Sequence, residues 1–232
     1  MGRVPRCRLG DGIYHVLNRG LNNSWILSQE QDRDYFTKLL DVQRRNFKLN
    51  VYHYVVMSNH FHIAVEVLDM KELSAYIGSV CSLYSRYWHG KNGGGHGPIW
   101  QGRYRSIAVQ KEEYMIRLGR YIERNPVVAQ MEGIEYPSNY RWYSADAYVS
   151  GINDPIVSVD RNQYWKQRGN DNKERKENYT AYIRMSVPED VELFNSLTSV
   201  IGDDDFKAKI RIKSGRPSIR GAGRPRKLNT KK

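Results

Sequence analysis

The chain has 232 residues, 40% of them hydrophobic and 27% charged, enough to bury the core of one ordinary domain and carry an appendage. Lysine and arginine outnumber aspartate and glutamate by 37 to 25, and the resulting net charge of +12 indicates a polyanionic partner. No apolar run approaches the roughly 20 residues of a membrane helix, and no apolar signal segment follows the first basic residues, which argues against a membrane partner and against secretion. With only two cysteines, we expect no disulfide framework and a reducing, cytoplasmic location.

The predicted elements alternate between strands and helices. In chain order they are a strand at 12–19, a helix capped by Ser28 and ending before Leu49, strands at 51–57 and 60–67 joined by a turn at 58–59, a helix at 71–89, a strand at 99–110, and a helix at 112–125. The last helix should stop at Asn125, because proline disfavours the helical conformation in the residue before it. This order predicts an α+β fold, a mainly antiparallel sheet covered by helices, rather than a doubly wound parallel sheet.

The rest of the chain divides into two further parts. Residues 139–150 should close the first domain, 1–150, by aromatic packing, and residues 151–205 indicate a small helical extension. Residues 206–232 hold eleven basic residues and no acidic one, whereas the remaining chain has 26 basic against 25 acidic residues. Such a Gly- and Pro-spaced basic tail predicts disorder in the free protein.

We expect the basic tail to lie along DNA phosphates. Its two Gly-Arg-Pro units resemble AT-hooks, in which an extended Arg-Pro segment enters a narrow minor groove. A tail that only solubilises the protein is the alternative. The predicted DNA-contacting residues of the tail are Arg216, Arg224, Arg226 and Lys227.

Two histidines in the third strand form the first candidate site. Side chains at positions i and i+2 of a strand point to the same face, so His60 and His62 should lie side by side with Phe61 behind them. Two imidazoles so placed can hold one divalent ion and leave coordination positions open for a phosphate oxygen. On spacing alone, packed or solvent-facing histidines remain the commoner outcome.

Tyr121 and Asn125 form the second candidate site. They are four residues apart in the predicted helix and so lie one turn apart on one face. The phenol could act as a nucleophile and the amide oxygen could complete a metal site. Most of the 17 tyrosines must serve packing instead, so this pair alone does not decide the function.

Three segments in consistent order resemble the single-tyrosine HUH transposases, and within them the REP-associated tyrosine transposase branch. The segments are MSNHFHIAV at 57–65, IWQGRYRS at 99–106 and GRYIERNPVVAQ at 119–130. The resemblance covers roughly residues 10–150 and implies a ferredoxin-like antiparallel sheet with helices on one face. It implies that His60 and His62 bind Mg²⁺ or Mn²⁺, with Asn125 as a further, less certain ligand, and that Tyr121 is the nucleophile.

The resemblance also implies the reaction and the partner. Tyr121 would cleave single-stranded DNA beside a short palindromic, REP-like hairpin, leaving a 5′-phosphotyrosine and a free 3′-hydroxyl, and a second 3′-hydroxyl could reverse the step. Arg103 and Arg105 in the fourth strand, and Arg120 beside Tyr121, are predicted to contact the DNA backbone. A prokaryotic, nucleoid-associated protein is expected. Whether it acts as a monomer or as a homodimer, with Tyr121 in cis or in trans, is left open.

Three other functions fit parts of this pattern. A DNA-binding or repressor protein could retain the fold without catalysis. A plasmid relaxase or rolling-circle initiator would share the histidines, although the chain offers one suitably placed tyrosine and no second histidine cluster. A metal-dependent phosphodiester hydrolase that uses water would cleave DNA without a covalent intermediate.

Overall fold

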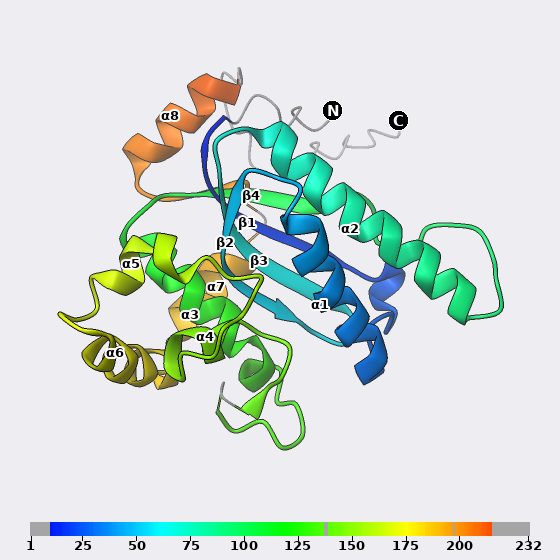
Figure 1. Ribbon diagram of the computed structural model, residues 1–232. Helices are drawn as coiled ribbons and strands as arrows, with labels where there is room; N and C mark the ends of the chain where they lie inside the picture. Colours follow the sequence, from blue (N-terminus) through cyan, green and yellow to red (C-terminus); the bar gives the residue numbers. More distant parts are fainter. Residues whose placement is uncertain (1–9, 137–138, 197, 215–232) are drawn as a thin grey trace, which may run out of the picture.

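The computed structural model describes residues 10–136, 139–196 and 198–214. The four predicted DNA-contacting residues of the tail, Arg216, Arg224, Arg226 and Lys227, lie outside these ranges. Within them, one sheet is covered by helices (Figure 1). The strands are β1 (Gly12–Arg19), β2 (Leu49–Val56), β3 (His60–Val67), β4 (Arg105–Val109) and β5 (Val200–Ile201). The helices are α1 (Glu30–Arg44), α2 (Met70–Lys91), α3 (Glu113–Val128), α4 (Ala145–Val149), α5 (Gln163–Lys166), α6 (Asn172–Arg184), α7 (Pro188–Asn195) and α8 (Asp204–Ser214).

The strand order of the sheet is β2-β3-β1-β4-β5, with β1 in the centre. β1 pairs antiparallel with β3 and β4, and β2 pairs antiparallel with β3. The α+β class predicted from the sequence is confirmed. The sheet is mixed rather than purely antiparallel, because the short strand β5 runs parallel to β4.

Helices lie on both faces of this sheet, so the expectation that they cover one face is wrong. On one face Phe61 of β3 packs against Phe36 of α1, with ring centroids 5.0 Å apart, and against Trp100 at 5.7 Å. On the other face α3 crosses β2 and β3. The burial of β3 agrees with this, since the strand is buried at nearly every position and so is covered on both faces.

The fourth strand is shorter than the predicted 99–110. Trp100 makes only an isolated bridge to Gly20, and regular pairing starts at Arg105. Gly102, with φ 140°, interrupts the extended chain between them. Arg103 therefore lies in a loop rather than in the strand with Arg105.

Helix α3 continues past Asn125 to Val128, which corrects the predicted stop before Pro126. Proline has no backbone N–H, so a helix with a proline near its C-terminal end loses one hydrogen bond and can continue for a few residues. This matters for the candidate site, because Asn125 lies within the helix and not at its end. Its side-chain Nδ2 donates to the backbone oxygen of Tyr121 at 2.8 Å.

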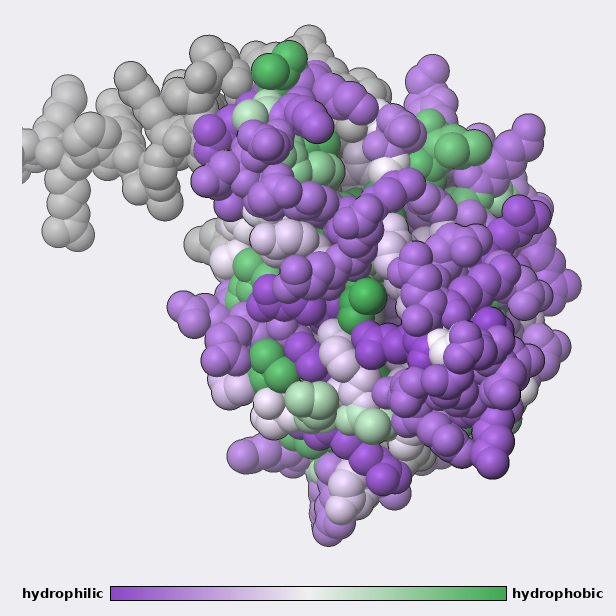
Figure 2. Space-filling view, turned by 90° about the vertical axis from the view of Figure 1, so that its left-hand side faces the viewer, coloured by the Kyte–Doolittle hydropathy of each residue, from purple (hydrophilic) through white to green (hydrophobic). Residues whose placement is uncertain are grey.

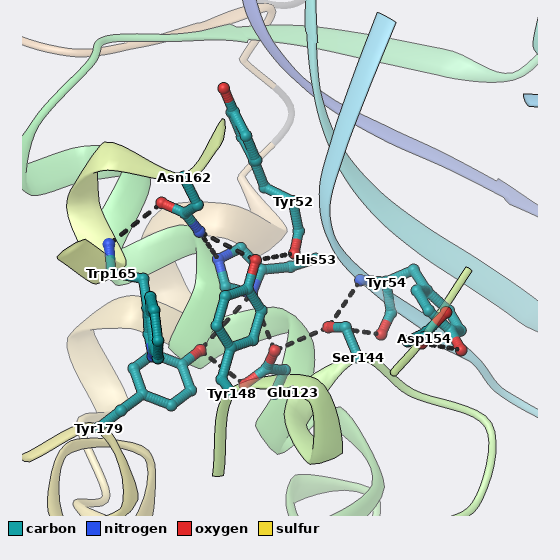
Figure 3. Close-up of polar contacts among 10 residues, drawn as sticks. All are labelled: Tyr52, His53, Tyr54, Glu123, Ser144, Tyr148, Asp154, Asn162, Trp165 and Tyr179. Atoms are coloured by element: carbon teal, nitrogen blue, oxygen red, sulfur yellow. Dashed lines mark hydrogen bonds and ion pairs between the residues drawn. The ribbon is translucent and has the colours of Figure 1, made fainter. Parts of the chain in front are cut away.

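A buried polar cluster fixes α3 against its surroundings (Figure 3). The carboxylate of Glu123 is fully buried and accepts hydrogen bonds from Ser144 at 2.7 Å and from Tyr179 at 2.7 Å, and it pairs with His53 Nδ1 at 2.8 Å. These partners come from β2, from α6 and from the residue before α4. We call Glu123, His53, Ser144 and Tyr179 the Glu123 cluster. It joins α3 to three other parts of the chain.

The segment predicted as a helical extension contains α5, α6 and α7, and it also supplies β5 to the sheet. Helix α7 is attached to α3 by ion pairs from Asp190 to Arg117 and Arg120, both at 2.7 Å. The basic tail was expected to be disordered from Phe206, but α8 runs to Ser214. Its Ile210 is buried, which gives this part of the tail an apolar side to pack.

The surface shown in Figure 2 is mainly hydrophilic, with small, separated hydrophobic spots. Among the described residues no helix combines the length and the apolar character needed to cross a membrane.

Candidate active site

The site lies on the face of the sheet that α3 covers. His62 of β3 is directly opposite Leu17 of β1, and His15 is opposite Ala64, two positions further along β3. Opposed residues of paired strands and residues two apart share a face, so His15, His60 and His62 all point toward α3. The predicted side-by-side placement of His60 and His62 is confirmed by their ring centroids, which are 5.0 Å apart.

His62 is hydrogen-bonded to His15, which was not among the predicted site residues. His15 Nε2 lies 2.8 Å from His62 Nδ1, and the two rings are stacked with centroids 5.0 Å apart. Burial, with a smaller contribution from Arg105, lowers the pKa of His15 to about 3. Burial also holds the pKa of His62 well below its usual range, with smaller contributions from His60, His15 and Arg105. Both rings are therefore neutral at physiological pH.

His60 is held by two asparagines. Its Nδ1 lies 2.6 Å from Asn59 Oδ1, so Nδ1 carries the proton and donates, and the neutral ring keeps its lone pair on Nε2. Burial lowers the pKa of His60 to about 4, a hydrogen bond with the Asn125 side chain opposes this shift, and Arg19 adds to it. Asn125 thus favours the protonated ring, because a neutral His60 with its lone pair on Nε2 has no N–H left to donate to the amide oxygen.

Tyr121 lies against both buried histidines. Its ring meets the edges of His62 and His15 with centroids 5.5 and 5.7 Å apart, and Phe194 of α7 packs on it at 5.1 Å. Its hydroxyl donates a 2.8 Å hydrogen bond to Asn195 Oδ1 at the end of α7. Burial raises the pKa of Tyr121 to about 12, while Asn125 and Arg105 act in the opposite direction.

A cavity of about 740 Å³ opens beside the histidines. His60 and His62 line it together with Asn195, and three arginines contribute positive charge to its wall: Arg19, Arg103 and Arg105. The cationic wall and the open side suit an anionic, elongated ligand.

Arg120 is the predicted DNA-contacting residue that the structure places elsewhere. Its guanidinium is buried, pairs with Asp190 and lies 4.2 Å from the ring centre of Tyr182. Arg117 also pairs with Asp190, and Lys111 pairs with Glu66 at 3.0 Å. The cation that acts on the pKa of Tyr121 is Arg105.

The imidazoles of His60 and His62 could hold a divalent cation. Both line the cavity, and Asn125, whose side chain interacts with His60, adds an amide whose oxygen is a ligand type that Mg²⁺ and Mn²⁺ accept. No group of three or more His, Cys, Asp or Glu side chains is placed to hold a metal among the residues described. The role of Asn125 as a further metal ligand stays a prediction.

The comparisons with known proteins identify the family and the fold. The family model of IS200-like transposases matches residues 10–125, half of the chain, and this protein therefore belongs to that family. Among solved structures, a REP-associated tyrosine transposase bound to a REP hairpin has a similar fold. The TM-score is 0.52 at 16% sequence identity, over 69% of this chain and 93% of that chain. No curated protein matches the sequence. The resemblance read from the three motifs is thus confirmed for the family and the fold.

Three residues around the site were missed by the sequence interpretation. His15 had a signal, because it occupies an inward position in the alternating strand 12–19 where an apolar side chain would be ordinary. Asn59 precedes the histidine motif directly, although no local pattern assigns its side chain to His60. Asn195 had no sequence signal, because it follows Tyr121 by 74 residues and approaches it only through the tertiary packing of α7.

Proposed function

We propose that this protein cleaves and rejoins single-stranded DNA beside a hairpin, with Tyr121 as the nucleophile. The observation that carries the proposal is the meeting of Tyr121, His62 and Asn125 within one chain, next to a cavity with arginines in its wall. Because a single chain supplies every part, we propose that Tyr121 acts in cis. The hairpin as substrate is supported by the similar fold of the transposase solved with a REP hairpin.

The metal ligands in this proposal are His60, His62 and Asn125. Mg²⁺ or Mn²⁺ held there would supply charge neutralisation at a non-bridging oxygen of the scissile phosphate. Arg103 and Arg105 would bind the neighbouring phosphates and orient the strand for in-line attack. Arg120 is not part of this proposal, since its guanidinium holds α7.

The covalent step follows from the state of Tyr121. With a pKa raised to about 12, the phenol is protonated at neutral pH, so its proton must leave for solvent as the new O–P bond forms. The bond from phosphorus to the 3′-oxygen breaks, and that oxygen leaves as a 3′-hydroxyl after taking up a proton. The downstream strand is then attached to Tyr121 through its 5′-phosphate. Attack by another 3′-hydroxyl on this phosphotyrosine reverses the step and joins strands without ATP.

One exposed aromatic residue suggests where an unpaired base could bind. The Trp25 side chain is 69% exposed, and it lies two residues after Asn23, which lines the cavity. Stacking of a base on an aromatic ring contributes about 1–3 kcal/mol. We expect Trp25→Ala to weaken binding of single-stranded DNA about tenfold, whereas Tyr136→Ala, another exposed aromatic, serves as the matched control.

The test uses a hairpin oligonucleotide with a single-stranded flank, taken from DNA near the gene and labelled at the 3′ end in one sample and at the 5′ end in another. After incubation with Mn²⁺, with Mg²⁺ or with EDTA, a denaturing gel should show the 3′ label attached to the protein only when metal is present. The 5′-labelled fragment should be released free. Tyr121→Phe should abolish the adduct and retain DNA binding.

Two results would contradict the proposal. Cleavage without an adduct would indicate hydrolysis by water, with Tyr121 in a structural role. Tight hairpin binding without cleavage, unaffected by EDTA or by Tyr121→Phe, would indicate a non-catalytic DNA-binding or repressor protein.

A further inference from the structure

His15 is a buried polar residue of which only one ring nitrogen is hydrogen-bonded. Its side chain is completely buried in the central strand, and Nε2 bonds to His62 Nδ1 at 2.8 Å. Its other ring nitrogen, Nδ1, is buried and has no hydrogen-bond partner within the described parts of the chain. A buried polar atom without a partner costs about 1–3 kcal/mol. A leucine or phenylalanine at this inward position would avoid that cost, so the imidazole needs a reason beyond packing.

The bond to His62 supplies that reason through the position of one proton. Two neutral imidazoles joined by a single hydrogen bond have two possible arrangements. If His15 donates, His62 carries its own proton on Nε2, and the nitrogen on the cavity side cannot bind a metal. If His62 donates from Nδ1, its Nε2 keeps the lone pair. In both arrangements Nδ1 of His15 stays unpaired, so the unpaired atom does not choose between them.

The parallel with His60 favours donation by His62. His60 Nδ1 must donate to the Asn59 amide oxygen, which places its lone pair on Nε2. A metal held between two histidines requires the same tautomer from both. Histidine ligands are commonly fixed in this way, by a second ring N–H donated to a neighbouring acceptor.

We infer that His15 is a positioning residue, which accepts the Nδ1 proton of His62 and thereby directs the Nε2 lone pair of His62 toward the metal. The inference rests on the proposed function. Packing prevents the His15 ring from turning away, since Phe194 and Tyr121 meet it edge-on at 6.0 and 5.7 Å. The residue opposite it on β3 is the small Ala64, which leaves room for the ring to lie against His62.

The variants follow from this geometry. His15→Phe fills the position with a ring that cannot accept a hydrogen bond. His15→Gln places an amide oxygen where Nε2 stands and so can still accept the proton from His62. Circular dichroism and thermal melting identify the variants that fold.

The first measurement is the tautomer of His62 in the metal-free protein, from the ¹⁵N shifts of histidine-labelled samples, with His62 assigned from the spectrum of His62→Ala. We expect protonated Nδ1 and unprotonated Nε2 in the wild type and in His15→Gln. A wild-type His62 protonated on Nε2 would overturn the inference. This measurement needs neither metal nor DNA, so it decides the role of His15 even if the proposed function fails.

The second measurement is Mn²⁺ binding by calorimetry. The Kd should rise about 10- to 100-fold in His15→Phe and stay within about threefold of the wild-type value in His15→Gln. An unchanged Kd in a folded His15→Phe protein would overturn the inference. If the wild type bound no Mn²⁺ at all, the metal part of the proposed function would fail, and the tautomer spectrum would still decide whether His15 orients His62.

Discussion

Two polar clusters lie on the same face of the sheet, and both are built around α3. In the Glu123 cluster, both oxygens of the carboxylate accept hydrogen bonds, and His53, Ser144 and Glu123 are all buried. In the other cluster His62 lines a cavity of about 740 Å³, and Tyr121, only two residues before Glu123, packs against His62. The same helix thus anchors itself through one cluster and carries the proposed nucleophile, Tyr121, in the other.

The difference separates a histidine held in a closed hydrogen-bond network from histidines that are open to a ligand. His53 is bonded to a buried carboxylate inside a closed network, which fits a role in stability. His60 and His62 have their Nδ1 atoms engaged, while their rings line an open cavity, and an unpaired nitrogen remains on the supporting His15. Burial alone does not separate the two sets, because His53, His62 and His15 are all buried.

The largest expected effect is on activity, at the cluster of His15, His60, His62 and Tyr121, which we call the open cluster. His60→Ala should reduce formation of the DNA adduct at least about a thousandfold, because several kcal/mol of transition-state stabilisation are lost with the metal. The free energy of unfolding should change by less than about 1 kcal/mol, because His60 lines a cavity rather than the core. Single-turnover gels and urea denaturation measure the two quantities. If activity fell only in proportion to the amount of folded protein, His60 would have a structural role like the one given to His53.

The converse variant tests the Glu123 cluster. Glu123→Ala leaves His53, Ser144 and Tyr179 without their shared partner and should lower the free energy of unfolding by about 3–5 kcal/mol. Urea denaturation checks this value, with the exposed Glu135→Ala as a control that should change little. The folded fraction of Glu123→Ala should bind Mn²⁺ as the wild type does. Normal stability would show that the network contributes little to holding α3.

Stability should also depend on pH because of the histidines at the open cluster. The pKa is about 3 for His15 and about 4 for His60 in the folded protein, whereas histidine in the unfolded chain titrates near 6.5. Between these values the unfolded state binds more protons. The free energy of unfolding should therefore have its full value above pH 6.5. It should fall as the pH drops toward 4, by up to about 1.4 kcal/mol per pH unit for each histidine.

Denaturation of wild type and His15→Phe across this range measures that dependence. The slope for His15→Phe should be smaller by one proton. Equal slopes would mean that His15 is protonated in the folded protein, contrary to its complete burial.

The smallest effect is expected at Asn195. Its bond to the Tyr121 hydroxyl stabilises the resting phenol and must break before attack, so Asn195→Ala should raise the rate of adduct formation about threefold. Phe194 continues to hold the ring. A slower reaction would instead show that Asn195 positions the nucleophile.

The sequence predicted the local parts of this molecule better than its assembly. Strand β3 begins and ends where predicted, and His60 and His62 share a face as their spacing requires. The fourth strand is shorter than predicted because Gly102 breaks it, and α3 is longer because one proline near a helix end removes a single bond. The partners of Tyr121 could not be predicted in the same way. Asn195 and Phe194 meet it through the docking of α7, and no local pattern encodes that contact.

The sheet order has a consequence for biosynthesis. β1 emerges first from the ribosome, yet it occupies the centre of the sheet, and both of its neighbours, β3 and β4, are made later. Tyr121 follows the histidines, and Asn195 follows Tyr121. Contacts between segments so distant along the chain form late. A nascent chain therefore carries the proposed metal ligands before it carries the proposed nucleophile, and the whole candidate site can assemble only when synthesis of the domain is nearly finished.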